Sequence, residues 1–144
     1  MGTHQLHDRV LASNPLARKQ GLALLERLHG GHTGEQLVES LAKVCPDFAT
    51  MTIEWALAGV MTRPALDLAT RELLLIAACT TLGFAPDQLR AHIEAALNVG
   101  ATREQVIETI VQMTFYAGGV ATSNALRIAA ATFAAIDREA GASA

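Results

Sequence analysis

The chain has 144 residues, of which 51% are hydrophobic, 17% charged and only 4% aromatic, and its formal net charge is −3. This length predicts one domain over residues 1–144 with a hydrophobic core of its own. The absence of a Lys/Arg cluster argues against nucleic-acid binding. The longest strictly apolar run, Leu73–Cys79, is far short of the roughly 20 residues that span a bilayer. The N-terminus lacks the apolar core of a signal peptide, so we expect a cytoplasmic protein with no membrane partner.

Capping and helix-breaking residues predict an all-α fold of about seven helices, because no strand-like alternation or hairpin signal interrupts them. Asn14 caps the first helix, with Pro15 in its first turn. The first three helices are expected at about residues 15–30, 33–44 and 46–58, and a connector follows at residues 59–66.

The second half of the chain carries stronger start and stop signals. Asp67 is the expected N-cap of a helix that Gly83 ends. Thr102 and Gln105 form a capping-box pattern two helices later. The four helices of this half are expected at about residues 68–82, 86–99, 103–118 and 121–138.

The segment Leu73–Cys79 is apolar on every side of its helix. Such a helix is buried all round, either centrally or between subunits. Together with the low charged fraction, this pattern favours a buried subunit interface, and we expect a homo-oligomer. A monomer with an unusually hydrophobic surface is the alternative.

His92 and Glu72 are the candidate acid–base residues. His92 shares its helix face with Leu89 and Ile93, so its imidazole is expected to point inward. It is either a core histidine bonded to a carbonyl or a general acid/base, since imidazole titrates near neutrality. Glu72 is expected in the first turn of its helix, where its negative charge either interacts favourably with the helix dipole or takes part in proton transfer. It shares one face of the helix with Leu75, Ile76 and Cys79, and such apolar surroundings raise the pKa of a carboxyl group.

The two cysteines, Cys45 and Cys79, lie far apart and form no C-x-x-C, so the sequence encodes neither a zinc site nor a local redox pair. Cys79 is expected to be a small packed hydrophobe, with a redox role as the alternative. No cationic residue lies within one helical turn of it to favour a thiolate.

Four further residues, Arg63, Arg71, Gln112 and Tyr116, are candidate substrate contacts. Arg63 and Arg71 flank the connector, and each forms either a surface salt bridge or a bidentate clamp on a substrate carboxylate. Glu108, Gln112 and Tyr116 form a polar stripe at helical spacing, which is either a solvated face or part of the site. The Ala-Gly-Gly that follows Tyr116 favours a close backbone approach there.

As an ordered set, these motifs resemble the carboxymuconolactone decarboxylase family, which shares its fold with the AhpD-type alkylhydroperoxidases. The resemblance covers roughly residues 55–135. Its elements are Arg63-Pro64-x-Leu66-Asp67-x-x-Thr70-Arg71, Leu89-x-x-His92-x-x-x-Ala96-Leu97-Asn98-x-Gly100-x-Thr102, Tyr116-Ala117-Gly118 and Asn124-Ala125-Leu126.

The resemblance implies an AhpD-like helical bundle that assembles as a ring-like oligomer, a hexamer or trimer. It implies a cofactor-free and metal-free loss of CO2 from a carboxylated unsaturated lactone in protocatechuate breakdown. Glu72 and His92 match the Glu and His of the peroxidase branch to within about one residue of spacing. The cysteine pair of that branch is missing, because residues 80–90 contain no cysteine.

The resulting hypothesis is a decarboxylase in which His92 and Glu72 carry the acid–base chemistry and Arg63 or Arg71 holds the substrate carboxylates. Two alternatives stay open. One is a peroxide or redox protein that works through Cys79, alone or paired with Cys45. The other is a non-catalytic helical assembly module in which His92 and Glu72 form a buried structural pair.

Overall fold

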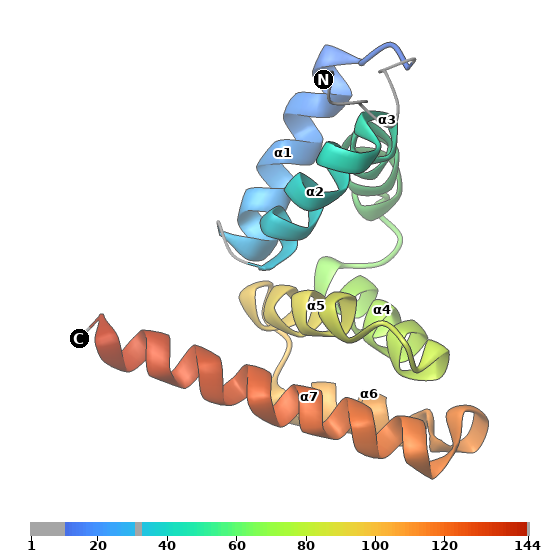
Figure 1. Ribbon diagram of the computed structural model, residues 1–144, viewed down its shortest axis with the longest axis vertical. Coiled ribbons are helices and arrows are strands. Elements are labelled where there is room, and N and C mark those ends of the chain that lie inside the picture. Colours follow the sequence, from blue (N-terminus) through green and yellow to red (C-terminus); the bar gives the residue numbers. More distant parts are fainter. Residues whose placement is uncertain (1–10, 31–32, 144) are drawn as a thin grey trace, which may run out of the picture. The chain divides into compact units, whose positions relative to one another are not determined.

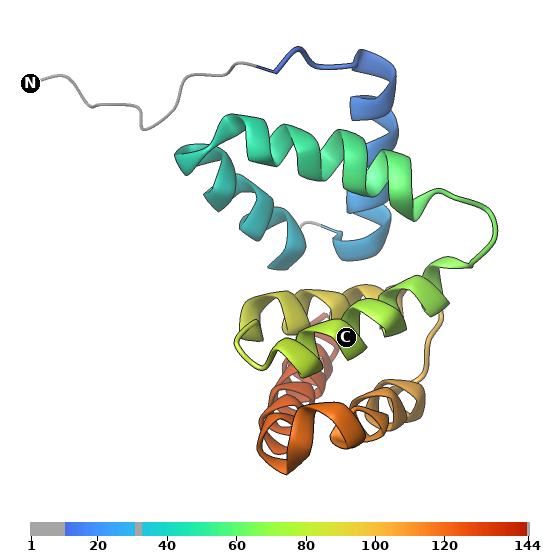
Figure 2. The same ribbon diagram turned by 90° about the vertical axis from the view of Figure 1, so that its right-hand side faces the viewer.

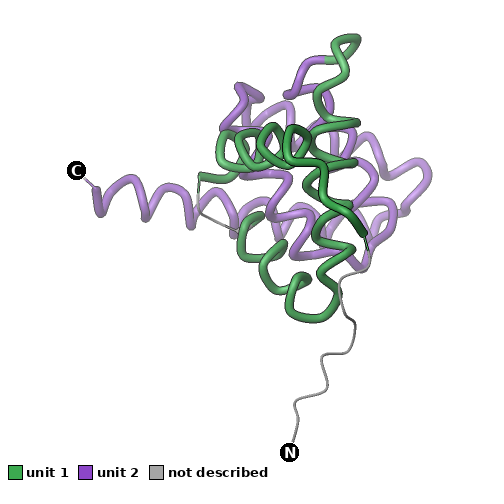
Figure 3. The backbone as a smooth tube through the Cα atoms, turned by 90° about the horizontal axis from the view of Figure 1, so that it is seen from above, with its two compact units in different colours: residues 1–66 green, residues 67–144 purple. Residues whose placement is uncertain are grey.

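The computed structural model describes residues 11–30 and 33–143. These residues form helices and no strand, which confirms the all-α prediction of about seven helices. The backbone divides into two compact units, residues 1–66 and 67–144 (Figure 3). The expectation of a single domain over the whole chain stays a prediction, and each unit is described by itself.

The first unit contains four helical segments: α1 (Pro15–His29), α2 (Thr33–Val44), α3 (Pro46–Met51) and the π-helix η1 (Thr52–Met61) (Figure 1). The predicted cap at Asn14 is confirmed, because its side chain accepts the backbone N–H groups of Leu16 and Ala17, both at 3.1 Å. α3 passes into η1 without leaving helical backbone angles. Leu24, Leu25 and Leu28 of α1 are buried in this unit.

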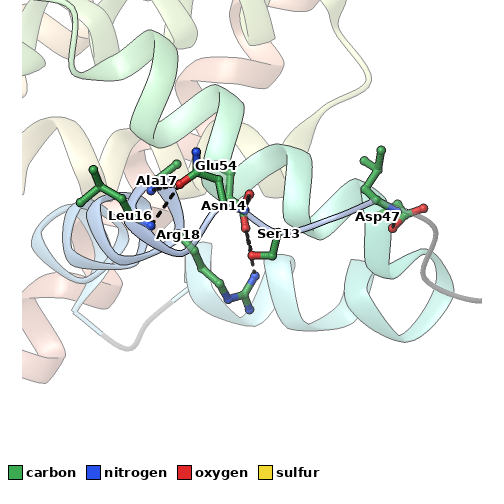
Figure 4. A network of polar contacts seen from close by, with 8 residues as sticks. Ser13, Asn14, Leu16, Ala17, Arg18, Asp47 and Glu54 are labelled. Atoms are coloured by element: carbon green, nitrogen blue, oxygen red, sulfur yellow. Dashed lines mark hydrogen bonds and ion pairs between the residues drawn. The ribbon is translucent and has the colours of Figure 1, made fainter.

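One carboxylate on η1 organises the start of α1 (Figure 4). Glu54 accepts the backbone N–H of Asn14 at 2.7 Å and the hydroxyl of Ser13, and it lies 3.9 Å from Arg18. Its partners are about 40 residues away in sequence, so no local pattern could have predicted the contact. Glu54 therefore fixes η1 to the N-terminus of α1.

The second unit contains α4 (Leu68–Leu82), α5 (Pro86–Asn98), α6 (Arg103–Gln112) and α7 (Thr114–Ala142). The predicted caps are confirmed. Asp67 accepts the N–H of Thr70 at 2.7 Å, and Gly83 ends α4 in the left-handed region at φ 76°. The Thr102–Gln105 capping box is complete in both directions.

Within this unit, α4 and α5 run side by side and lie over α6 and α7 (Figures 1 and 2). Fully buried aliphatic side chains from all four helices fill the space between them. This core consists of Ile76, Leu89, Ile93, Ala96, Ala101, Val106, Ile110, Ala125 and Ala129.

Several predicted helix boundaries are wrong. The third helical run continues to Met61 instead of stopping at 58, so the connector is shorter than expected. α6 ends at Gln112, not near 118, because the chain turns at Met113. The predicted break at Gly118 is present as a single residue with φ 80° and ψ 167° inside α7.

Within one chain α4 is not buried on every side, so the central alternative is wrong and burial between subunits stays a prediction. Ile76 and Thr80 are buried, but Leu74 is 54% exposed and Ala78 is also exposed. The helix therefore has one face in the core and one face open to a partner or to solvent.

By length and composition alone, α7 is long and apolar enough to cross a membrane. Core helices of globular proteins pass the same test. The buried Ala125, Ala129 and Thr132 of α7 pack within the second unit. A cytoplasmic location stays a prediction.

Candidate active site

Glu72 of α4 and His92 of α5 meet across the interface between their helices. His92 Nδ1 lies 2.8 Å from Glu72 Oε2. The Glu72 side chain is only 1% exposed, whereas the His92 side chain is 26% exposed. The pair is thus a buried carboxylate that holds an imidazole at the edge of the packed interior.

The local structure of α4 and α5 explains this meeting. Both side chains face inward on neighbouring helices of the second unit, on the stripes expected for them. Glu72 lies beyond the first turn of α4, which contains no acidic residue, so the expected first-turn position is wrong. Its placement is therefore not explained by the positive end of the helix dipole, which acts only within that turn.

The direction of this hydrogen bond depends on the tautomer of His92. With an ionised Glu72, which only accepts hydrogen bonds, His92 Nδ1–H is the donor. In that tautomer Nε2 is the nitrogen that exchanges a proton with a ligand. Burying a carboxylate without a partner destabilises the folded state, so the hydrogen bond to His92 also offsets part of the cost of burying Glu72.

Cys79 is close enough to this pair to be affected by it. Burial raises the pKa of the Cys79 thiol, and the negative charge of Glu72 raises it further. Both effects disfavour the thiolate, which is the nucleophilic form of cysteine. Both cysteines of the chain are free thiols.

We expect Cys79 to alkylate more slowly than free glutathione at pH 7.5, because its raised pKa leaves less thiolate. Iodoacetamide labelling in a Cys45→Ser background, followed by mass spectrometry, measures this rate.

The raised pKa of Cys79 also makes the stability of the fold depend on pH. In the unfolded chain the Cys79 thiol has its ordinary, lower pKa, so it loses its proton at a lower pH than in the folded chain. The stabilisation that the protonated thiol gives is therefore present at neutral pH and is lost towards alkaline pH.

The Glu72→Gln variant tests whether the negative charge of Glu72 contributes to the raised pKa of Cys79. Removing the carboxylate charge should accelerate Cys79 labelling while burial keeps it slower than glutathione. Labelling of Cys79 as fast as glutathione in the wild type would contradict the assignment, and an unchanged rate in Glu72→Gln would contradict the proximity of the two groups.

The two candidate arginines occupy different units. Arg71 is partly buried on α4, next to Glu72 in sequence. Arg63 is exposed and follows η1 in the first unit. Arg71 is therefore the arginine that the structure places on the helix of the Glu72–His92 pair.

Gln112 and Tyr116 are separated by the turn at Met113, so the expected continuous stripe from Glu108 to Tyr116 is wrong. Gln112 ends α6 and lines an open groove of about 370 Å³ between α4 and α6. Tyr116 lies in the first turn of α7 with 90% of its surface exposed.

Sequence reasoning missed a small cavity of about 190 Å³ between α4, α5 and α7. Cys79, Leu89 and Asn124 are among its lining residues. Leu89 precedes His92 by one turn and Cys79 follows Glu72 by two turns, so the cavity lies along both helices of the pair. Asn124 is part of the Asn124-Ala125-Leu126 motif of the family resemblance, and that motif was the only sequence feature that pointed to this residue.

The described side chains place no group of three His, Cys, Asp or Glu residues close enough to hold a metal ion. What the second unit presents is an all-helical scaffold with a buried Glu–His pair at a helix interface. This arrangement suits proton transfer to or from a small organic molecule.

Comparisons with known proteins point to one enzyme family. The profile described as "Carboxymuconolactone decarboxylase family" matches residues 46–131. A protein of Acinetobacter baylyi named 4-carboxymuconolactone decarboxylase is 33% identical over 115 residues, which are 80% of this chain and 85% of that protein. An uncharacterized 15.0 kDa protein of Paracoccus denitrificans is 36% identical over 103 residues, 71% of this chain and 77% of that protein.

The chain therefore belongs to the carboxymuconolactone decarboxylase family. The matched region contains both Glu72 and His92.

Proposed function

We propose that the protein is a cofactor-independent decarboxylase of a carboxylated unsaturated lactone such as 4-carboxymuconolactone. The observation that carries the proposal is the 2.8 Å contact between buried Glu72 and partly exposed His92. The name of the Acinetobacter relative supports the choice of substrate.

The reaction needs no external electron sink. When CO2 leaves, the electron pair of the broken C–C bond moves through the ring double bond onto the lactone carbonyl. A dienolate forms, and a proton added to its carbon restores the carbonyl. The enzyme must hold the carboxylates, stabilise the oxyanion and deliver that proton.

As the imidazolium, with a proton on each nitrogen, His92 provides the proton or the hydrogen bond to the oxyanion through Nε2, while Nδ1–H donates to Glu72. A proton transferred to the substrate carbon is replaced from solvent before the next turnover. Fixed donors aimed at developing negative charge are effective because they need no reorganisation during the reaction. Arg71 or Arg63 binds the carboxylates, and Gln112 and Tyr116 stay candidate substrate contacts. The protein is further expected to be a cytoplasmic homo-oligomer, a hexamer or trimer.

The direct test is the ultraviolet absorbance of 4-carboxymuconolactone after addition of purified protein. We expect the substrate signal to disappear in proportion to enzyme concentration, and trapping in barium hydroxide should recover one CO2 per substrate. Substrate loss equal to that in buffer alone would overturn the proposal.

A peroxide-reducing role is the main competing reading, and one assay separates it. If Cys79 reduced peroxide, the Cys79→Ser variant would lose that activity. We expect neither protein to reduce peroxide, because the raised pKa of Cys79 opposes thiolate formation. Under our proposal Cys79→Ser leaves lactone turnover near the wild-type rate.

A further inference from the structure

The cavity between α4, α5 and α7 has one amide side chain in its wall, that of Asn124. The volume of the cavity is about 190 Å³. A water molecule takes up about 30 Å³ of the liquid, so this space suits a small ring with its substituents. The other polar side chains of the wall are Cys79 and Thr80, and the Thr80 hydroxyl already donates to the Ile76 carbonyl at 2.8 Å.

The contact with Arg127 determines how the Asn124 amide is oriented. Arg127 Nη1 lies 3.1 Å from Asn124 Oδ1. A guanidinium only donates hydrogen bonds, so the amide must turn its oxygen, which is its acceptor, towards Arg127. The amide nitrogen keeps two N–H donors for another partner. A cation that binds the amide oxygen also polarises the amide, which makes these N–H groups stronger donors.

The cavity lies next to the Glu72–His92 pair. Leu89 of its wall precedes His92 by three residues, about 4.5 Å along the helix axis. Side chains of an α-helix tilt towards its N-terminus, so His92 leans towards the turn that contains Leu89. The negative charge of Glu72 contributes to the raised pKa of the Cys79 thiol, in agreement with a short distance between the carboxylate and the cavity wall.

Asn124 also lies where the cavity meets the outer surface of α7. An open groove of about 530 Å³ on that surface includes both Asn124 and Arg127 in its wall. Among the described residues that line the cavity and the groove, Arg127 is the one charged side chain. A positive charge at this place attracts a substrate that carries carboxylates.

We propose that Asn124 donates a hydrogen bond to the lactone carbonyl of the substrate in this cavity, and that Arg127 is the positioning residue that orients the amide. The inference rests on the proposed decarboxylase function. It divides the chemistry between two residues: Asn124 stabilises the oxyanion, and His92 delivers the proton to carbon. No bond to Asn124 forms or breaks, and the electron pair released with CO2 ends in the new C–H bond.

The first test is the steady-state kinetics of Asn124→Asp with 4-carboxymuconolactone. Aspartate has the size of asparagine and keeps an oxygen for Arg127, but when ionised it has no donor. We expect kcat to fall about 10²–10³-fold, the usual effect of removing one oxyanion donor. Asn124→Leu, which is neutral, should show a similar loss. Ser123→Asp is the matched control for the added charge, because it places a carboxylate on the exposed side of α7 and should keep the wild-type kcat.

Variants of Arg127 test the positioning role. Arg127→Met loses the bond to Asn124 and should lower kcat about fivefold, the effect of one ordinary hydrogen bond. Arg127→Lys keeps a cationic donor and should restore most of the rate. Arg127 is exposed, so neither variant should change the unfolding temperature. A merely structural residue would affect that temperature and leave the split between kcat and KM unchanged.

Alkylation of Cys79 reports whether the cavity is occupied, because Cys79 lines it. In a Cys45→Ser background, 4-carboxymuconolactone at ten times its dissociation constant should slow iodoacetamide labelling of Cys79 about tenfold, since only the free protein reacts. Asn124→Leu should weaken this protection. Cys45 in a Cys79→Ser background is the control, because Cys45 belongs to the first unit and should label at the same rate with and without substrate. Serine is close to cysteine in size, so the shape of the cavity is retained.

The outcomes separate this inference from the proposed function. Turnover by the wild type without protection of Cys79, or a folded Asn124 variant with the wild-type kcat, would overturn the inference and leave the decarboxylase proposal intact. A wild type without turnover would overturn both. If circular dichroism shows that Asn124→Asp is unfolded, Asn124→Leu and the protection of Cys79 in the wild-type cavity decide the result.

Discussion

Replacing His92 by alanine is expected to lower the rate of lactone decarboxylation by roughly 10²–10⁴-fold, the usual contribution of a positioned proton donor. The loss should appear in kcat, because Nε2 acts on the transition state and Arg71 or Arg63 binds the carboxylates. Added imidazole should restore part of the rate, since it can occupy the vacated space. Steady-state kinetics of the wild type and variant measure both effects.

The same substitution leaves Glu72 buried without its partner, which costs about 1–3 kcal/mol of stability. The double variant Glu72→Leu/His92→Leu removes both polar groups, and replacing both partners by apolar groups is often nearly neutral. We therefore expect the double variant to be more stable than His92→Ala while remaining inactive. Thermal unfolding of the variants separates the catalytic role from the structural one.

Arg90→Ala is the matched control on the same helix, because Arg90 is exposed on α5 and lies off the face of His92. It should retain wild-type turnover and stability. A fully active His92→Ala protein would refute the role given to His92. A wild type without turnover whose pair variants only lose stability would favour the assembly-module alternative instead.

Local sequence chemistry predicted those helix ends that carry a cap or a stop residue. The caps at Asn14 and Asp67, the stop at Gly83 and the capping box at Thr102 each depend on residues within one turn, and all are present. The turn at Met113 has no such signal, so the sequence could not place the end of α6. The π-helical form of η1 was missed for the same reason.

The candidate pair was predictable in part. The helical stripes showed that Glu72 and His92 each face inward, but their contact joins residues 20 positions apart on different helices. Periodicity reports the direction of a side chain within one helix and gives no information on the neighbour it meets. The groove between α4 and α6 and the turn at Met113 are likewise products of tertiary packing, so Gln112 and Tyr116 were grouped in one stripe that the structure divides.

The packing of α1 against η1 depends on one residue, Gly21, that no sequence pattern singled out. Gly21 is buried on α1, and a methyl group at its Cα would overlap the backbone carbonyl of Ile53 on η1. A backbone carbonyl cannot rotate away as a side chain does, so the two helices would have to separate. This close approach requires the absence of a Cβ.

Gly21→Ala is therefore expected to destabilise the first unit by about 3 kcal/mol, the upper end of the usual range for overpacking. Urea unfolding followed by the fluorescence of Trp55, the one tryptophan of the chain, reports on this unit because Trp55 lies on η1. Gly59→Ala is the control, since its new methyl group would meet only ordinary contacts, the nearest at 3.7 Å. It should stay within about 0.5 kcal/mol of the wild type. Equal midpoints for Gly21→Ala and the wild type would show that α1 and η1 do not approach as closely as described.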